Sequence, residues 1–109
     1  MNLNEYQQAA KQTAVYPPEF KVLYPILGMN GEAGEAAEKV KKLIRSGKWG
    51  LIDTIDIKEI AKELGDCLWY ISAAAGDLGL SLESVAQINL DKLANRAARD
   101  TIKGEGDNR

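Results

Sequence analysis

Apolar residues recur along most of this chain at intervals of three and four, the spacing that places them on one face of an α-helix. The clearest run follows Pro25, and another begins near Asp53 and ends near Ala75. Shorter runs precede Pro17 and follow Ser81. No segment alternates apolar and polar residues convincingly, as a half-buried strand would. The pattern predicts an all-α protein, folded as an antiparallel bundle of about four helices.

Local signals mark where these helices begin and end. Residues that can cap a helix N-terminus stand at three of the expected starts: Asn2 with Glu5, Asp53 or Thr54, and Ser81. The second helix is expected to begin after Pro25 and to end at the Ser-Gly pair of residues 46–47. Residues 1–100 are therefore expected to form one helical domain, followed by a polar tail at 101–109 that is expected to be disordered.

Two pairs of carboxylates, each three residues apart, lie beside the apolar stripes of the second and third helices: Glu32 with Glu35, and Glu63 with Asp66. This spacing places both acids of a pair on one side of a helix. If the two helices are antiparallel neighbours, the acidic flanks can face each other. Carboxylates gathered in this way repel one another, and Mg²⁺ would neutralise them. A solvated charged surface explains either pair alone, but together the pairs favour a metal site.

Composition restricts the chemistry further. The chain of 109 residues has a net charge of −2, no histidine and a single cysteine, Cys67. Without histidine, Ser-His-Asp catalysis and histidine-ligated zinc are excluded, so a bound metal must accept oxygen ligands. The acidic balance and the lack of a basic stripe argue against a nucleic-acid partner. No apolar run reaches the ~18 residues of a membrane span, and no signal-peptide pattern is present, so a cytoplasmic protein is expected.

Glycine and aromatic residues in the helices suggest close contacts of other kinds. Gly31 and Gly34 each cost roughly 1 kcal/mol relative to alanine inside a helix. Either the close approach of another group or tight helix packing would explain them. Trp69 projects away from the apolar stripe of the third helix, which favours a subunit interface over a partly exposed surface indole. Four other aromatic residues could stack on a base, although such side chains more often pack: Tyr6, Tyr16, Trp49 and Tyr70.

The residues around both acid pairs resemble a known family. The segments GEAGEAAE at 31–38 and ELGDCLWY at 63–70 are similar to the Glu-x-x-Glu, spacer, Glu-x-x-Asp signature of the MazG-like, all-α nucleoside triphosphate pyrophosphohydrolases. The segments at 5–17 and 81–96 resemble the short, single-domain branch, so the likeness covers nearly the whole chain. The spacer of 27 residues between Glu35 and Glu63 lies near the long end of the family's range. The stretch at 48–57 departs from the tightest members in being longer, which leaves the loop's contribution to substrate choice open.

The resemblance implies Mg²⁺-dependent hydrolysis of a nucleoside triphosphate to the monophosphate and pyrophosphate, and carboxylate ligands would also accept Mn²⁺. It implies that the metal is held by Glu32, Glu35, Glu63 and Asp66, and that phosphates are bound by Asn89, Lys92 and Arg96. Lys39, which projects between Glu32 and Glu35, is counted with the substrate-binding residues. Glu35 and Glu38 are the candidates for the base that accepts a proton from the attacking water. The resemblance also implies a homodimer or homotetramer, in which helices of a neighbouring subunit complete the active site.

Two other functions are compatible with these residues. The same metal site in a triphosphatase or diphosphatase would release orthophosphate, and product analysis separates this reaction from the first. A non-catalytic helical module would instead bind a nucleotide, or a protein through the Trp69 surface, and would use the acids only for solubility. Mg²⁺ would then fail to raise its thermal stability, because a ligand stabilises a protein only by binding its native state.

Overall fold

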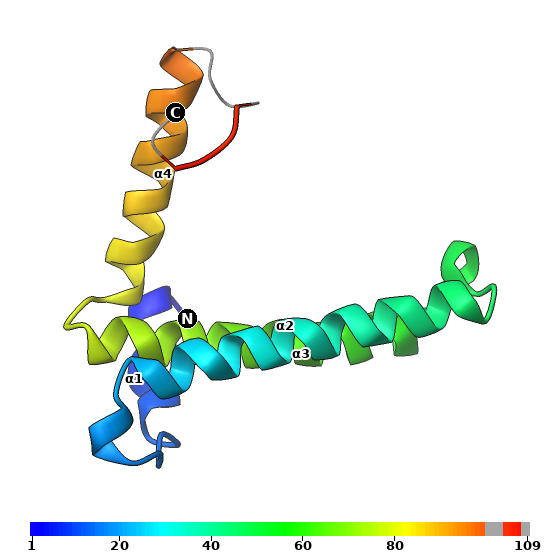
Figure 1. Cartoon of the computed structure of the whole chain (residues 1–109), viewed down its shortest axis with the longest axis horizontal. Coiled ribbons are helices and arrows are strands. Elements are labelled where there is room, and N and C mark those ends of the chain that lie inside the picture. The colour runs from blue at the N-terminus through cyan, green and yellow to red at the C-terminus, as the bar shows by residue number, and fades with distance from the viewer. Residues whose placement is uncertain (100–103, 108–109) are drawn as a thin grey trace.

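The computed structural model describes residues 1–99 and 104–107, and every regular element among them is helical. Four α-helices and two short 3-10 helices follow one another: α1 (Leu3–Lys11), η1 (Pro18–Phe20), α2 (Leu23–Arg45), η2 (Trp49–Leu51), α3 (Thr54–Asp77) and α4 (Leu82–Ala98). The predicted all-α class is confirmed. Residues 100–103 and 108–109, which belong to the tail predicted to be disordered, lie outside the described residues. Figure 1 shows α2 and α3 side by side, with α4 projecting from one end of the pair.

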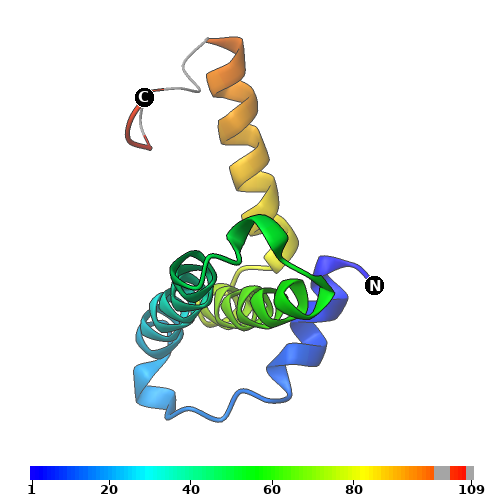
Figure 2. The ribbon, with the colours of Figure 1, turned by 90° about the vertical axis from the view of Figure 1, so that its right-hand side faces the viewer.

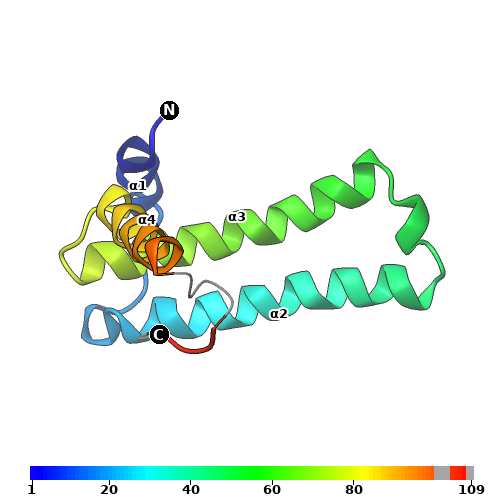
Figure 3. The same ribbon diagram turned by 90° about the horizontal axis from the view of Figure 1, so that it is seen from above.

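The central feature is the antiparallel hairpin of α2 and α3, seen from above in Figure 3. Its connection is fixed at both ends by the capping groups that the sequence predicts. Gly47 ends α2 with a φ of +72°, and the next amide, of Lys48, donates to the carbonyl of Leu43 at 2.8 Å. Asp53 and Asp56 open α3 with a reciprocal capping box, in which each carboxylate accepts from the other residue's amide, at 2.9 and 3.1 Å.

The start of α2 differs from the prediction. The helix begins at Leu23, two residues before Pro25, because a proline in the first turn removes an N–H that has no helical partner. Val22 precedes the helix with a φ of +68°, an unusual conformation for a β-branched residue. Its amide donates to Asp77 Oδ2 at 2.9 Å, and the same oxygen accepts from the Tyr16 hydroxyl at 2.6 Å. Asp77 thus fastens the connector between α1 and α2 to the end of α3.

A buried glutamine on α1 joins three elements at this end of the hairpin. The amide nitrogen of Gln7 donates to the carbonyl oxygens of Ser72 on α3, at 3.3 Å, and of Leu80 in the following turn, at 3.1 Å. The amide oxygen of Gln7 accepts from the backbone N–H of Leu82 at 2.9 Å, so the same side chain also fixes the first residue of α4. Since all three interactions cross between elements, Gln7 holds α1 and the start of α4 against α3.

Beyond its first turn, α4 extends away from the hairpin, as Figure 2 shows. Leu82 is buried at the junction, but Ile88 and Leu90 further along are 59% and 58% exposed. The radius of gyration is 16.7 Å, whereas a compact chain of about 100 residues has a value near ~13 Å. A single chain therefore leaves apolar surface of α4 uncovered. No helix in the described part of the chain is both long and apolar enough to cross a membrane.

Candidate metal and nucleotide site

Three acidic side chains converge between the two helices of the hairpin. Glu32 comes from α2 and Glu63 and Asp66 come from α3, and each offers a carboxylate oxygen within 4.8 Å of the others. The antiparallel pairing brings the two acidic flanks together, as their positions beside the apolar stripes suggested. Glu63 is the more enclosed of the α3 pair, with a side chain only 12% exposed.

A glycine one helical turn before Glu32 sets the separation of the two helices here. A Cβ atom on Gly28 would overlap the ring of Tyr70, which lies one turn beyond Asp66 on α3. Apart from the adjacent residues and backbone of α2 itself, nothing lies within 4 Å of where a Cβ would be placed on Gly31 or Gly34, the two glycines that stood out in the sequence. The close approach of α2 and α3 therefore depends on Gly28, which the sequence analysis missed.

The two remaining acidic candidates on α2 do not join the three converging oxygens. Glu35 is exposed, yet its charge is near enough to contribute to the raised pKa of Glu32. Glu38 instead pairs with Lys41 at 3.0 Å, and this ammonium holds the pKa of Glu38 below its usual range. Of the two candidate bases, Glu35 therefore lies closer to the acid cluster of Glu32, Glu63 and Asp66.

The pKa values of Glu32 and Glu63 are shifted in opposite directions. Desolvation, a hydrogen bond with Glu63 and the negative charges of its neighbours raise the pKa of Glu32. Glu63 has a lowered pKa, chiefly because the ammonium of Lys39 stabilises its ionised form. Of these two acids, Glu32 is therefore the one whose negative charge is less well compensated, and a cation placed among these oxygens would relieve the repulsion.

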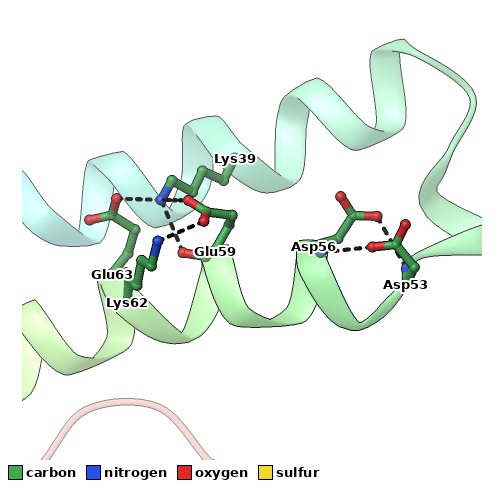
Figure 4. A network of polar contacts seen from close by, with 6 residues as sticks. All are labelled: Lys39, Asp53, Asp56, Glu59, Lys62 and Glu63. Atoms are coloured by element: carbon green, nitrogen blue, oxygen red, sulfur yellow. Dashed lines mark hydrogen bonds and ion pairs between the residues drawn. The ribbon is translucent and has the colours of Figure 1, made fainter.

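Lys39 is held between the helices by two acids of α3 (Figure 4). Its Nζ lies 2.7 Å from Glu63 Oε1 and 3.3 Å from Glu59 Oε2, and it donates to the backbone carbonyl of Glu59 at 3.0 Å. Lys62 pairs with the other carboxylate oxygen of Glu59 at 2.8 Å. Lys39, predicted to bind substrate, therefore lies directly beside the acid cluster.

An open hollow of about 350 Å³ adjoins two members of the acid cluster. It is lined by Glu32, Asp66, Thr13, Trp69 and Tyr70. The indole N–H of Trp69 donates to the Thr13 hydroxyl at 2.8 Å, so the surface predicted as a subunit interface contacts the segment after α1 in the same chain. The part played by Thr13 could not be found from the sequence, because no local signal shows that α1 crosses α3 here.

A larger cavity, of about 600 Å³, lies between α1, the connector to α2 and the end of α3. None of the clustered carboxylates lines it, so the smaller hollow is the one that carries the candidate chemistry. Tyr16 lines the larger cavity and stacks on Tyr24 at a centroid distance of 5.1 Å. Trp49 belongs to η2 at the far end of the hairpin. Burial and a nearby carboxylate of the acid cluster raise the pKa of Tyr6, but Tyr6 does not line the smaller hollow. Of the four base-stacking candidates, Tyr70 is the one that lines it.

The predicted phosphate-binding residues are carried on α4, away from the hairpin (Figure 1). Asn89 is exposed, and Lys92 and Arg96 both contact the C-terminal segment. The carboxylate of Asp107 lies 2.9 Å from Lys92 Nζ and 3.4 Å from Arg96 Nη2. Arg96 Nη2 also donates to the backbone carbonyls of Gly106 and Asp107, at 3.2 and 2.8 Å. These two cations therefore accommodate an anionic oxygen group. Within one chain, however, they lie on α4, whereas the acid cluster lies between α2 and α3.

Comparison with known proteins places this arrangement in a family. Residues 23–99 match the MazG nucleotide pyrophosphohydrolase domain, a range that includes α2, α3 and α4. The chain belongs to this family. It is also 42% identical over 115 aligned positions to the gene 37 protein of Mycobacterium phage L5, and the alignment covers the whole of both chains. No solved structure gives a significant match. The MazG domain thus contains both predicted acid pairs and the predicted phosphate-binding helix.

The opposite pKa shifts of Glu32 and Glu63 predict opposite effects of removing each charge. The pKa of Glu32 is raised above the ordinary 4.5, so its ionised form destabilises the native MazG domain at pH 7, and this penalty is absent below pH 4.5. The pKa of Glu63 is lowered from 4.5, so its ionised form stabilises the fold, and that contribution is lost only as the pH falls through the lowered value. Glu32→Gln should raise the Tm of the metal-free protein at pH 7, and Glu63→Gln should lower it.

Thermal unfolding followed by circular dichroism in the presence of a chelator, between pH 4 and pH 7, measures both effects. The increase in Tm that Glu32→Gln produces should become smaller as the pH approaches 4.5. Shifts of the same sign for both variants at pH 7 would contradict the charge balance described here.

Proposed function

We propose that this protein hydrolyses nucleoside triphosphates to nucleoside monophosphates and pyrophosphate with Mg²⁺, for which Mn²⁺ can substitute. The observation that carries the proposal is the convergence of Glu32, Glu63 and Asp66 between α2 and α3, within the segment that matches the MazG domain. A helical module that merely bound a nucleotide or protein would gain nothing from gathering mutually repelling carboxylates.

The clustered residues fit a hard divalent cation. All three donors are carboxylate oxygens, which Mg²⁺ and Mn²⁺ prefer over softer metals. The raised pKa of Glu32 reflects burial and unrelieved negative charge, which a cation would offset. Glu35, on the same helix and close enough to act on Glu32 electrostatically, is proposed as the fourth ligand. It could reach the ion directly or through a water.

The chain's own residues divide the remaining tasks. When bound, the cation supplies charge neutralisation on the phosphates and a more acidic water. Glu35 is the preferred base for the proton of the attacking water, since Lys41 already engages Glu38. Lys92 and Arg96 would hold phosphate oxygens, and the carboxylate of Asp107 between them supports their capacity to bind an anion. Asn89 and Lys39 are proposed to assist in substrate binding.

A second copy of the chain would complete this site. In one chain α4 extends away from the acid cluster and leaves Ile88 and Leu90 exposed, and an antiparallel bundle formed between subunits would cover such a surface. We propose a homodimer or homotetramer in which α4 of one subunit brings Lys92 and Arg96 to the carboxylates of the other. Trp69 is half-buried and contacts Thr13 after the end of α1, and the surface around it is proposed as part of the interface.

The reaction is tested by product analysis with purified protein, Mg²⁺ and a panel of canonical and modified nucleoside triphosphates. Monophosphate together with pyrophosphate is the expected outcome. Glu63→Gln should lower turnover by a factor of about 100 or more, comparable with loss of one preorganised electrostatic group, while the helical content is retained. Glu38→Gln is the matched control and should retain most of the activity, because Glu38 pairs with Lys41 outside the acid cluster.

Each other outcome identifies a different error. Diphosphate together with orthophosphate would mean that the metal site is right and the cleaved bond is wrong. No product from any nucleotide, with Mg²⁺ or Mn²⁺, would favour the non-catalytic binding module. Full activity of Glu63→Gln would refute the assignment of the acid cluster.

Sharing of the site between subunits is tested by mixing two variants, each of which is expected to lose most of its activity on its own. Glu63→Gln removes a carboxylate of the hairpin, and Lys92→Ala removes a cation of α4. If α4 serves the neighbouring subunit, a mixed dimer contains one intact site, so mixing and reassociating the two variants should restore activity. If each chain used its own α4, every site would carry one of the two substitutions and the mixture would remain inactive.

A further inference from the structure

Lys39, which is proposed to assist in substrate binding, also pairs with a proposed metal ligand in the nucleotide-free protein. The closest partner of its ammonium, at 2.7 Å, is the carboxylate of this ligand, Glu63. It is a cation already present among carboxylates that are proposed to bind another cation. An ordinary surface ion pair would not require a partly buried lysine on α2 to reach an acid on α3 that is only 12% exposed.

Two anchors on Glu59 keep Lys39 beside the acid cluster whatever Glu63 does. The ammonium donates to the backbone carbonyl of Glu59 at 3.0 Å and contacts the Glu59 carboxylate at 3.3 Å (Figure 4). Lys62 holds the other oxygen of that carboxylate at 2.8 Å, which limits its movement. If Glu63 turned toward a bound ion, Lys39 would still place a positive charge at the edge of the site.

We propose that Lys39 is the counter-ion of the acid cluster and makes binding of the divalent cation depend on the nucleotide. This inference rests on the proposed function, because it requires that the acid cluster takes up the cation. In the nucleotide-free protein, Lys39 competes with the divalent cation for Glu63, and its positive charge repels that cation. The phosphates of an incoming nucleotide reverse this effect, because their negative charge is attracted both to the ammonium and to the divalent ion.

The size of the effect follows from Coulomb's law. A unit charge and a divalent ion about 4 Å apart in water repel each other enough to weaken binding by roughly 30-fold. Salt and solvent exposure reduce this to about tenfold for a partly exposed lysine. When nucleotide is bound, its phosphates offset the charge of the ammonium, so Lys39 penalises the cation mainly in the nucleotide-free protein. The lysine therefore raises the factor by which nucleotide tightens cation binding, and by reciprocity the factor by which the cation tightens nucleotide binding.

The experiment measures Mn²⁺ binding by electron paramagnetic resonance, with and without a triphosphate analogue whose α–β bridging oxygen is replaced by methylene. Lys39→Met should bind Mn²⁺ alone about tenfold more tightly than the unsubstituted protein, and the analogue should tighten Mn²⁺ binding by a smaller factor. Lys39→Gln removes the charge but keeps a hydrogen-bond donor, so it gives the same readout if the methionine variant folds poorly. Lys39→Arg should behave like the unsubstituted protein.

Lys62→Met is the matched control, because Lys62 pairs with Glu59 but makes no ion pair with Glu63. It should leave Mn²⁺ binding within about twofold of the unsubstituted protein, as expected for a more distant, exposed and screened charge. Unchanged or weaker Mn²⁺ binding by the Lys39 variants, in a protein that turns over nucleotide, would overturn this inference and leave the proposed function standing. Lys39 would then serve only to hold α2 against α3 through its ion pairs. No Mn²⁺ binding by any variant, with or without the analogue, would overturn both.

Discussion

Mutual repulsion among Glu32, Glu63 and Asp66 is the constraint on which the rest of this structure depends. Three carboxylate oxygens within 4.8 Å of one another would separate unless the backbone held them together or a positive charge compensated them. The chain provides both. The α2–α3 hairpin fixes the positions of the acids, and Lys39 supplies one compensating charge from the same pair of helices.

The geometry of the hairpin follows from contacts at several points along its length. Gly28 lies against Tyr70, and further along the pair Lys39 reaches the backbone of Glu59, as expected for two antiparallel helices in one register. The Asp53–Asp56 capping box fixes the start of α3. At the other end Gln7 fastens α1 and α4 to α3. These interactions are individually modest, but together they keep both acidic flanks facing the same space.

The parts of this arrangement that depend on local chemistry could be predicted from the sequence. The caps at Asn2, Asp53 and Ser81 determined three helix starts, and the three-residue spacing of the acids showed which would share a side of a helix. The start of α2 was placed too late, because Pro25 was treated as lying before the helix when a proline can occupy its first turn.

Features that depend on distant residues could not be predicted in the same way. Gly28 matters because a ring from another helix fills the space beside it, whereas Gly31 and Gly34 show the same sequence signal without such a neighbour. The partners of Lys39 and Gln7 lie 20 or more positions away along the chain. The departure of α4 from the hairpin had no local signal either. Its uncovered apolar residues are a physical reason to expect a neighbouring subunit.

The measurement that tests the central claim most directly is the thermal stability of the protein as Mg²⁺ is added in the absence of nucleotide. A cation that binds the native acid cluster must raise the Tm progressively with its concentration, beyond the change produced by the same ionic strength of a monovalent salt. We expect that rise, setting in only at high Mg²⁺ concentrations because Lys39 opposes binding. A Tm that responds to Mg²⁺ no more than to monovalent salt would contradict the account, since the converging carboxylates would then not be a metal site.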